Sequence, residues 1–223
     1  MIKNLCVLIP SYNESKTIGR IIRHLKGRGL VVYVVDDGSI DDTAKIAESE
    51  KAVVLKHREN KGKGASLIEG FRHVLKKNYD AVLVMDGDNQ HDPSDINNFV
   101  EEANQTGADM VIGNRMNDTS SMPYIRTVTN KWMSGIISFL SGQRILDSQC
   151  GFRLIKKEVL EKIELESSNY EIESELILKA ARGGFKIGSV PIKTVYQNEK
   201  SRINPFLDTI RFVRFMLKFL FER

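Results

Sequence analysis

Short apolar runs alternate with segments of helical periodicity along the first half of the chain. Between the runs, apolar residues recur three and four positions apart, as on one face of a helix; Ile18, Ile21 and Leu25 are an example. Strands rich in Val and Ile that alternate with helices favour an α/β fold with a Rossmann-like, mostly parallel sheet flanked by helices. The runs that we expect to form its strands are residues 5–9, 31–35, 53–55, 81–85 and 110–112.

Residues typical of helix ends support this division of the chain. Asp41 or Asp42 is suited to cap the helix that follows the second run. Asp92 followed by Pro93 is a typical start for the helix after the fourth run. A further helix is predicted over residues 170–182, and the two glycines that follow it mark its end.

The pattern changes after residue 115. Residues 114–131 are rich in Asn, Ser, Thr and Met and are predicted to form a loop, followed by a helix around Trp132. Residues 186–190 and 192–196 flank a proline and are predicted to form an edge pair of strands. The chain as a whole divides into one domain, residues 1–204, and a basic amphipathic C-terminal helix, residues 205–223.

Composition narrows the class of protein. Hydrophobic residues make up 41% and charged residues 28% of the 223 residues, which indicates a folded domain. The net charge of +4 is small, and we expect no nucleic acid among the partners. Cys6 and Cys150 lie far apart, which argues against a disulfide framework and fits a reducing, cytoplasmic location. No stretch reaches the roughly 18 uninterrupted apolar residues of a membrane span, so we expect a soluble or peripherally bound protein.

Polar residues gather where four of the predicted strands end. In a parallel sheet these ends lie on one edge, and ligands bind at that edge. The sequence therefore places the functional site there. The four polar segments are residues 10–14, 36–39, 86–88 and 113–115.

Asp86-Gly87-Asp88 follows a predicted buried strand. Two carboxylates two positions apart can lie near one Mg²⁺ or Mn²⁺, which takes one or two protein carboxylates and fills its other positions with phosphate oxygens and water. Such a metal neutralises a diphosphate leaving group. The alternative is an acidic turn that caps the next helix, a role for which Asp92 is also suited.

Three other polar features have weaker signals. Asp36 and Asp37 could accept hydrogen bonds from a ribose or a base, or could simply form a turn before a helix. Residues 60–64, Asn-Lys-Gly-Lys-Gly, lack the spacing of a phosphate loop and could be a solvated turn. His91 lies at the edge of the predicted site and is a candidate for direct involvement, and the other histidines are expected at the surface: His24, His57 and His73.

Taken together, these motifs resemble glycosyltransferase family 2. The similarity is strongest to the polyprenol-phosphate (dolichyl-phosphate) mannosyl- and glucosyltransferases, and it extends over nearly the whole chain. The matching segments are VLIPSYNE at 7–14, VVDDGS at 34–39, NKGKG at 60–64, MDGDNQH at 85–91, GNR at 113–115, DSQCGFR at 147–153 and VP at 190–191.

The resemblance implies a GT-A fold in the domain of residues 1–204, a Mg²⁺ or Mn²⁺ ion, and transfer of a hexose from a UDP- or GDP-sugar to a polyprenyl phosphate with inversion. It implies that Asp88 and Gln90 ligate the metal and that Arg126 and Asn130, in the loop before the Trp132 helix, face the acceptor phosphate. The residues that would contact the nucleotide sugar are Pro10, Tyr12, Glu14, Asp36, Asp37, Asp86, Gly87, Asp88, Arg115 and Arg202.

The sequence departs from the family pattern in three places. Relatives often carry Arg-Gly-x-Ser-Lys where this chain has residues 198–202, Asn-Glu-Lys-Ser-Arg, although Arg202 can still neutralise a diphosphate. The family's Thr/Ser-Gly-Phe is Cys-Gly-Phe here, at residues 150–152. Many relatives also carry membrane spans after the catalytic domain, and this chain has none.

The nature of the acceptor decides the mechanism. A phosphate is already an anion, so it needs charge screening by a metal and by arginines such as Arg115 rather than a strong base. A hydroxyl acceptor would require a carboxylate base, for which Asp147 is the candidate. Asp147 could equally be a turn residue that anchors the following Gly-Phe. The candidate catalytic residues are therefore Asp86, Asp88, Arg115 and Asp147.

The tail carries Arg211, Arg214 and Lys218 on a narrow strip of an otherwise apolar helix. Such a helix can lie in the interface of an anionic leaflet, which would place the protein at the inner face of a membrane. It could instead pack on the domain or on a second subunit in a homo-oligomer.

Three other functions remain open from the sequence. A glycosyltransferase with a soluble or hydroxyl acceptor would share this chemistry. A sugar-nucleotide nucleotidyltransferase would also use paired metal carboxylates, but its first loop should be rich in Gly and basic residues, and residues 11–14 are Ser-Tyr-Asn-Glu. A non-catalytic nucleotide-sugar-binding protein is the third.

Overall fold

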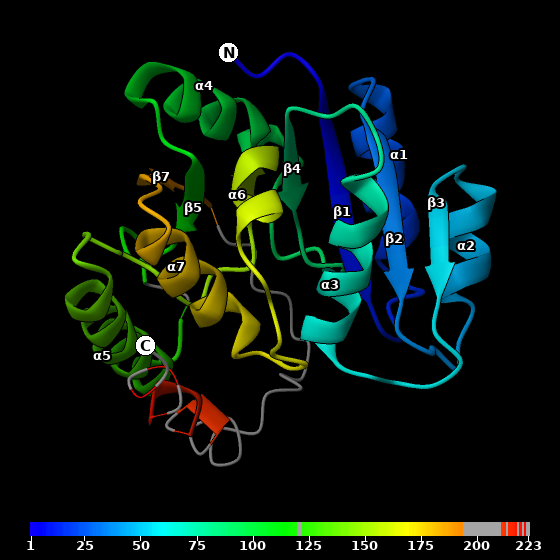
Figure 1. Cartoon of the computed structure of the whole chain (residues 1–223). Coiled ribbons are helices and arrows are strands. Elements are labelled where there is room, and N and C mark those ends of the chain that lie inside the picture. Colours follow the sequence, from blue (N-terminus) through cyan, green and yellow to red (C-terminus); the bar gives the residue numbers. More distant parts are fainter. Residues whose placement is uncertain (120–121, 194–210, 213, 218, 220, 222–223) are drawn as a thin grey trace.

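A seven-stranded sheet forms the centre of the molecule (Figure 1). The structure is a computed structural model and describes residues 1–119, 122–193, 211, 212, 214–217, 219 and 221. The strand order is β3-β2-β1-β4-β6-β5-β7, and β6 is antiparallel to both of its neighbours. The expected mostly parallel sheet is therefore confirmed. The strands are β1 (Leu5–Ser11), β2 (Val31–Asp36), β3 (Val53–Lys56), β4 (Ala81–Val84), β5 (Met110–Asn114), β6 (Arg153–Lys156) and β7 (Ile187–Pro191).

Helices cover both faces of the sheet, as the alternating pattern predicts. Figure 1 shows α3, α6 and α7 on one face, and α1, α2 and α4 lie on the other. Helix α5 packs on α7 at the side of the molecule. The helices are α1 (Ile18–Gly27), α2 (Thr43–Ser49), α3 (Lys63–Val74), the 3₁₀ turn η1 (Pro93–Asp95), α4 (Ile96–Thr106), α5 (Tyr124–Ser141), α6 (Lys157–Lys162) and α7 (Ile172–Arg182).

The predicted helix caps can be compared with the structure. Asp42 precedes α2, but the cap is made by Asp41, whose carboxylate accepts a hydrogen bond of 3.0 Å from the backbone N–H of Thr43. Asp92 accepts a hydrogen bond from the N–H of Ser94, and Pro93 opens η1 as expected. Helix α7 ends before the two glycines, as predicted.

The second half of the chain differs from the sequence-based expectation in three respects. The loop predicted over residues 114–131 is wrong from Tyr124 onward, because α5 begins there. Its first turns are rich in β-branched residues of modest helix propensity, which tertiary contacts override. Strand β6 has only two apolar residues and was not predicted.

The predicted edge pair is the third difference. Strand β7 pairs in parallel with β5, and the N–H of Ile192 donates to the carbonyl of Asn114. A single proline between the two predicted runs leaves no room for the two-residue turn of a hairpin. Residues 194–196 lie outside the described part of the chain.

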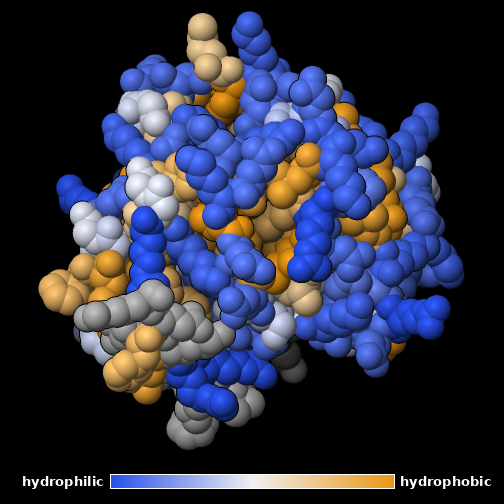
Figure 2. All heavy atoms as spheres, viewed as in Figure 1, coloured by the Kyte–Doolittle hydropathy of each residue, from blue (hydrophilic) through white to orange (hydrophobic). Residues whose placement is uncertain are grey.

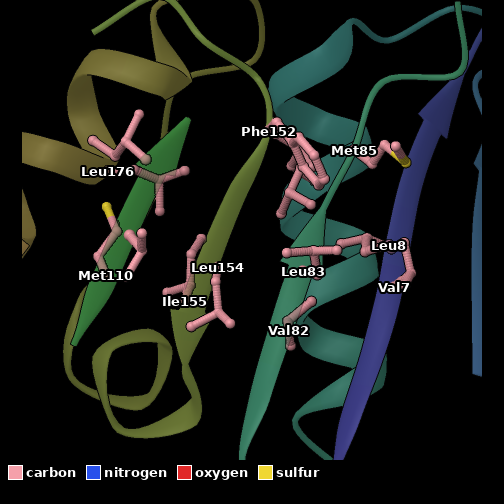
Figure 3. Packing of buried hydrophobic residues seen from close by; sticks show 14 of the residues in the cluster. Val7, Leu8, Val82, Leu83, Met85, Met110, Phe152, Leu154, Ile155 and Leu176 are labelled. Atoms are coloured by element: carbon pink, nitrogen blue, oxygen red, sulfur yellow. The ribbon is translucent and has the colours of Figure 1, made fainter. Parts of the chain in front are cut away.

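The hydrophobic core lies on both faces of the sheet. Figure 3 shows side chains of β1, β4, β6 and β5 lined up across neighbouring strands, with Leu176 of α7 near the strand that carries Met110. Phe152 packs against Phe99 of α4 with 4.4 Å between the ring centroids. Both cysteines are buried and free, and burial raises the pKa of each thiol to about 12. The expected absence of a disulfide is therefore confirmed.

The described residues of the tail are helical and pack on the domain. Phe212, Met216 and Phe219 are buried. The guanidinium of Arg182 lies 3.4 Å from the centroid of the Phe219 ring and donates a hydrogen bond to the Phe219 carbonyl. One side of the tail is thus fixed to α7. No helix among the described residues is long and apolar enough to cross a membrane.

Close packing between α3 and β1 leads to a first prediction. A Cβ atom at Gly70 would lie 2.5 Å from the side chain of Leu8, so Gly70→Ala should destabilise the protein by about 1–3 kcal/mol. Gly135 of α5 has no atom within 4 Å of such a Cβ, and Gly135→Ala should stabilise by about 0.5–1 kcal/mol. Urea unfolding measures both changes, and equal free energies of unfolding for the two variants would contradict this packing.

Candidate functional site

The ends of β1, β2, β4 and β5 meet on one edge of the sheet, as expected (Figure 1). The pairing register sets Ser11 of β1 beside Asp36 of β2, and Asp86 lies two residues after the end of β4. The polar segments that the sequence indicated are thus brought together by the parallel pairing.

The loop after β1 packs against the Asp-Gly-Asp turn. The Thr17 hydroxyl donates a 2.6 Å hydrogen bond to the carbonyl of Gly87, and the N–H of Glu14 donates to the Thr43 hydroxyl. A Cβ atom at position 87 would lie 2.7 Å from the oxygen of Ser11. Glycine at this position therefore lets the two loops approach. Pro10 and Tyr12 belong to β1 and the start of this loop.

Asp37 holds the Asn-Lys-Gly-Lys-Gly turn in place. Its two carboxylate oxygens accept hydrogen bonds from the N–H groups of Lys61 and Gly62, at 2.9 and 2.8 Å. Gly38, with φ of 72°, lets the chain turn against residues 59 and 60. The segment is therefore not a solvated turn, and Asp37 has a clear structural role within it.

His57 is buried beside Asp37, so the expectation that it lies at the surface is wrong. Its Nδ1 atom lies 2.6 Å from the Asp37 carboxylate, and its Nε2 atom lies 2.8 Å from the carboxylate of Glu69 on α3. His57 thereby links the middle of α3 to the end of β2. His24 is exposed as expected, and His73 is half-buried against Tyr33.

Asp36 is the last residue of β2, at this edge of the sheet, and its carboxylate has unused hydrogen-bonding capacity. It is buried, and its Oδ1 atom has no hydrogen-bond partner within the described residues. A buried acceptor of this kind is costly unless a donor satisfies it. A ribose hydroxyl or a base N–H would supply that donor.

Lys63 lies at the centre of the site. Its ammonium is 2.6 Å from a carboxylate oxygen of Asp86 and 2.7 Å from one of Glu173 on α7. Burial alone would lower the pKa of Lys63, but the two carboxylates outweigh burial and raise it above its usual value. The lysine therefore carries a permanent positive charge between them.

Asp86 is held in its charged form by the same contacts. Burial would raise its pKa, but Lys63 and then His91 lower it below the usual value. The Nε2 atom of His91 lies 3.6 Å from the other oxygen of Asp86, and the histidine ring stacks on Phe152. A side chain at Gly151 would clash with the Asp86 carboxylate. His91 is therefore in direct contact with the candidate site.

Asp88 lies at the open side of the turn. It is half-buried, and its Oδ1 atom accepts a hydrogen bond of 2.9 Å from the N–H of Gln90. Burial and the charge of Asp86 raise the pKa of Asp88, so this turn has a surplus of negative charge. The carboxylate of Asp88 and the amide oxygen of Gln90 are hard donors that suit Mg²⁺ or Mn²⁺.

A metal at this turn would not be enclosed by protein ligands. Within the described part of the chain, no group of three or more His, Cys, Asp or Glu side chains converges on a metal position. An ion held by Asp88 and Gln90 would thus have to complete its shell with water or phosphate oxygens, as Mg²⁺ commonly does. The residues fit such an ion.

Arg115 and Asp147 form a buried pair. The Nε and Nη2 atoms of Arg115 donate to the two oxygens of Asp147, at 2.7 and 2.9 Å. Burial would raise the pKa of Asp147, but Arg115 holds it below the usual value. A carboxylate that is paired, buried and of low pKa is a poor general base. The geometry thus favours the anchoring role that the sequence also suggested for Asp147.

The segment between Asp147 and β6 is fixed to α5 and α7. Arg153, fully buried, donates to the carbonyls of Ser148, Cys150 and Glu173. The Ser134 hydroxyl of α5 accepts a hydrogen bond from the N–H of Ser148. These contacts fix the position of α5 relative to the site.

The residues expected near the acceptor lie on α5 rather than in a loop, which corrects that placement. Arg126 is half-buried. Asn130 is buried one turn before Ser134, and its Nδ2 atom has no hydrogen-bond partner within the described residues. An incoming oxygen acceptor could satisfy this donor. Arg202 lies outside the described part of the chain.

Three residues of the site carry no individual signal in the sequence. Lys63 lies within a glycine-rich motif, but nothing in the motif indicates that its charge is buried. His57 and Glu173 pair with residues that are distant in the chain, and the helix pattern does not show these pairings. Glu173 follows a buried isoleucine on α7, and a charged residue at a core-facing position is the one local clue.

A mostly parallel sheet of this kind, with an Asp-x-Asp turn after a central strand, is the framework of a GT-A glycosyltransferase. Residues 6–164 match the family model "Glycosyl transferase family 2", and the chain belongs to this family. It is therefore a nucleotide-sugar glycosyltransferase. This result excludes the nucleotidyltransferase and the non-catalytic binding protein as alternatives.

Curated relatives and solved structures agree with this assignment. The UDP-N-acetylglucosamine–dolichyl-phosphate N-acetylglucosaminyltransferase of Methanococcus voltae is 31% identical over 217 residues, covering 87% of this chain and 86% of the relative. The polyprenol monophosphomannose synthase of Mycolicibacterium smegmatis is 34% identical over 200 residues, covering 83% and 75%. The fold is similar to glucosyl-3-phosphoglycerate synthase from Mycobacterium tuberculosis in complex with Mn²⁺, UDP-glucose and phosphoglyceric acid, with a TM-score of 0.75, 18% identity and coverage of 97% and 79%.

The buried Arg115–Asp147 pair leads to a prediction about stability. Asp147→Asn leaves a buried guanidinium without its counter-charge and should cost about 3–5 kcal/mol at pH 7. Because the folded-state pKa of Asp147 is lowered, its contribution is present above the unfolded pKa of ~3.9 and is lost as pH falls through the folded value. The difference between variant and parent should therefore shrink in acid.

Urea unfolding of both proteins at pH 7 and in acid measures this effect. Asp42→Asn is the matched control, because Asp42 pairs with Lys45 at the exposed surface and such pairs contribute about 0–1 kcal/mol. A loss for Asp147→Asn no larger than that of the control would contradict the role of the pair.

Proposed function

We propose that the protein transfers a hexose from a UDP- or GDP-sugar to the phosphate of a polyprenyl or dolichyl phosphate, with inversion and with Mg²⁺ or Mn²⁺. The reaction would take place at the inner, cytoplasmic face of a membrane, because a polyprenyl phosphate is confined to the membrane. The Methanococcus and Mycolicibacterium relatives are named for dolichyl-phosphate and polyprenol substrates.

The observation that carries this proposal is the state of the carboxylates around the site. Asp86 and Glu173 are paired with Lys63, and Asp147 is paired with Arg115. None of these three is placed to take a proton from a hydroxyl group, and the proposal assigns Asp36 to the nucleoside and Asp88 to the metal. An acceptor phosphate already carries negative charge and needs no base, so it suits this site better than a hydroxyl does.

The donor would bind across the loops after β1, β2 and β4. The nucleoside would lie over Pro10, Tyr12, Glu14 and Asp36, where Asp36 supplies a buried acceptor. Lys63 and Arg115 would offset part of the negative charge around the diphosphate, since each is already paired with carboxylates of the site. When bound to Asp88 and Gln90, the divalent ion would neutralise the diphosphate leaving group.

The acceptor would approach from α5. Arg126 and the side-chain amide of Asn130 would hold its phosphate, and Asn130 has a buried N–H donor for this purpose. Repulsion between an anionic nucleophile and an anionic leaving group is the main barrier that such a site must lower. The cationic residues on both sides of the reacting atoms would lower it.

Removing the proposed metal ligand tests the donor half of the proposal. Asp88→Ala should weaken Mn²⁺-dependent nucleotide binding by more than the 10- to 100-fold that is typical of residues supporting a metal ligand. The fold should remain intact, because Asp88 lies on an open turn. Asp92→Asn is the control: it keeps the helix cap and should bind as the parent does. Calorimetry with UDP and GDP, with and without Mn²⁺, would refute the assignment if Asp88→Ala bound normally.

Arg126 tests the acceptor half. Arg126→Ala should raise the KM for a polyprenyl phosphate by about 10- to 100-fold, which corresponds to one lost hydrogen bond to a charged group. The KM for the nucleotide sugar should change little. Steady-state kinetics with a radiolabelled donor gives both values, and Arg20→Ala on the exposed face of α1 is the control. An equal rise in both KM values would place Arg126 in the donor site or in a structural role.

A donor screen tests the reaction as a whole. Hydrolysis of UDP- and GDP-sugars is followed with Mn²⁺, in the presence and absence of a polyprenyl phosphate. A donor that is consumed only when the lipid phosphate is present, with a lipid-linked sugar as product, is the expected result. Transfer to a soluble hydroxyl compound in place of the lipid would overturn the choice of acceptor.

A further inference from the structure

Helix α5 has two opposite faces of different character. The face toward the domain buries Thr127, Asn130, Ser134 and Ile137. On the other face, large apolar side chains are open to solvent, by 79% for Ile125, 55% for Trp132 and 84% for Phe139. We call this exposed side, with Val128 included, the α5 face.

The residues of the α5 face form one stripe. At 100° per residue, Ile125, Val128, Trp132 and Phe139 fall within an arc of about 60°, opposite the buried side. The stripe is about 21 Å long, since it spans 14 residues at a rise of 1.5 Å. Monomeric soluble proteins rarely leave so continuous an apolar surface in water, so something should cover it.

The tail extends this surface. A groove of about 570 Å³ between α5 and the tail is lined by Trp132, Phe139 and other apolar residues, including Met216 and Leu217. Leu217 and Phe221 point outward while the other side of the tail is buried on the domain. Figure 2 shows hydrophobic side chains protruding over α5 and beside the tail. The two helices therefore form one apolar surface, to which α5 contributes the larger part.

The charges around the α5 face indicate what covers it. Helix α5 contains two basic residues, Arg126 and Lys131, and no acidic residue. Arg211 and Arg214 of the neighbouring tail are exposed, but they line a separate hollow with Glu166, Glu171 and Glu175, so the basic charge of the α5 face comes from α5 itself. A second copy of the chain seated on this face would bring like charges together, which opposes association. An anionic bilayer would satisfy both the apolar stripe and its basic border.

We propose that the α5 face is the surface by which the protein sits on an anionic lipid bilayer, with Trp132, Ile125 and Phe139 inserted at the boundary between head groups and acyl chains. Tyr124 and Trp132 are residue types that favour this boundary. The inference rests on the proposed function, because Arg126 and Asn130 of the same helix would then receive a phosphate at the depth of the head groups. The tail, whose buried side is fixed to α7, borders this surface but does not by itself form the anchor.

The sequence provides its own probe of this proposal, because Trp132 is the single tryptophan of the chain. Full-length protein is mixed with vesicles of phosphatidylglycerol and phosphatidylcholine, with or without bromine on the acyl chains. The Trp132 emission should shift to shorter wavelength, and brominated chains should quench it. Neutral phosphatidylcholine vesicles should bind less protein, and high salt should weaken binding to the anionic ones.

Variants separate the α5 face from the rest of the surface. Phe139→Ser and Ile125→Ser should each weaken binding to anionic vesicles by about tenfold, since each removes a large apolar side chain from lipid. Val31→Ser is the matched control: Val31 is also exposed but begins β2, at the opposite end of the strands from the site, and its replacement should leave binding unchanged. Flotation measures the bound fraction, and thermal unfolding confirms that each variant is folded.

Several results would overturn the proposal. They are an absence of flotation with anionic vesicles at low salt, binding without quenching of Trp132, binding that survives both serine substitutions, and a dimer in sedimentation that the substitutions dissociate. Transfer to a short, water-soluble prenyl phosphate keeps the two proposals apart. If that transfer occurs while vesicle binding is absent, the α5 proposal fails and the proposed function stands. If the protein binds vesicles and no prenyl phosphate is glycosylated, the proposed function fails and the α5 face remains a membrane-binding surface.

Discussion

The ammonium of Lys63 joins three segments that are distant in the sequence. Lys63 is the first residue of α3, and its ammonium contacts Asp86 after β4 and Glu173 on α7. It thereby connects the two halves of the sheet at the site. Without its charge, two carboxylates would face each other in a partly buried space. The position of Lys63 depends in turn on Asp37, which holds the preceding backbone, and on the glycines that let this turn approach residues 167–169.

This arrangement explains why the ligand edge is both acidic and well ordered. Negative side chains accumulate there because metal and sugar chemistry require oxygen donors. Each buried one is balanced by a cation or by backbone N–H groups, except for the oxygen of Asp36, which has no partner in the part of the chain that the structure describes. Asp88 stands apart because it lies on the open side of its turn. The balance therefore leaves Asp36 and Asp88 as the carboxylates that a ligand can complete.

The sequence allowed the strands of the first half, their parallel arrangement and the site edge to be predicted, because each depends on local patterns of apolar runs and the residues that end them. Strand β6 escaped prediction because its stability comes from β4 and β5 on either side. The start of α5 escaped for a similar reason, since its Thr- and Val-rich turns have modest helix propensity and the helix is held by contacts of Ser134 with Ser148 and by α7. His57 and Glu173 could not be assigned because a pairing partner is a property of the folded chain.

The antiparallel strand between β4 and β5 has a consequence for biosynthesis. Strand β5 has no hydrogen-bonded contact with the first four strands except through β6, which lies some forty residues later in the chain. While the ribosome is still producing that interval, β4 and β5 each present an unpaired, apolar edge, the kind of surface on which nascent chains aggregate. The segment from Asp147 to β6 that completes the site also closes these edges, so a chain stopped before it would lack the active site and be prone to self-association at once.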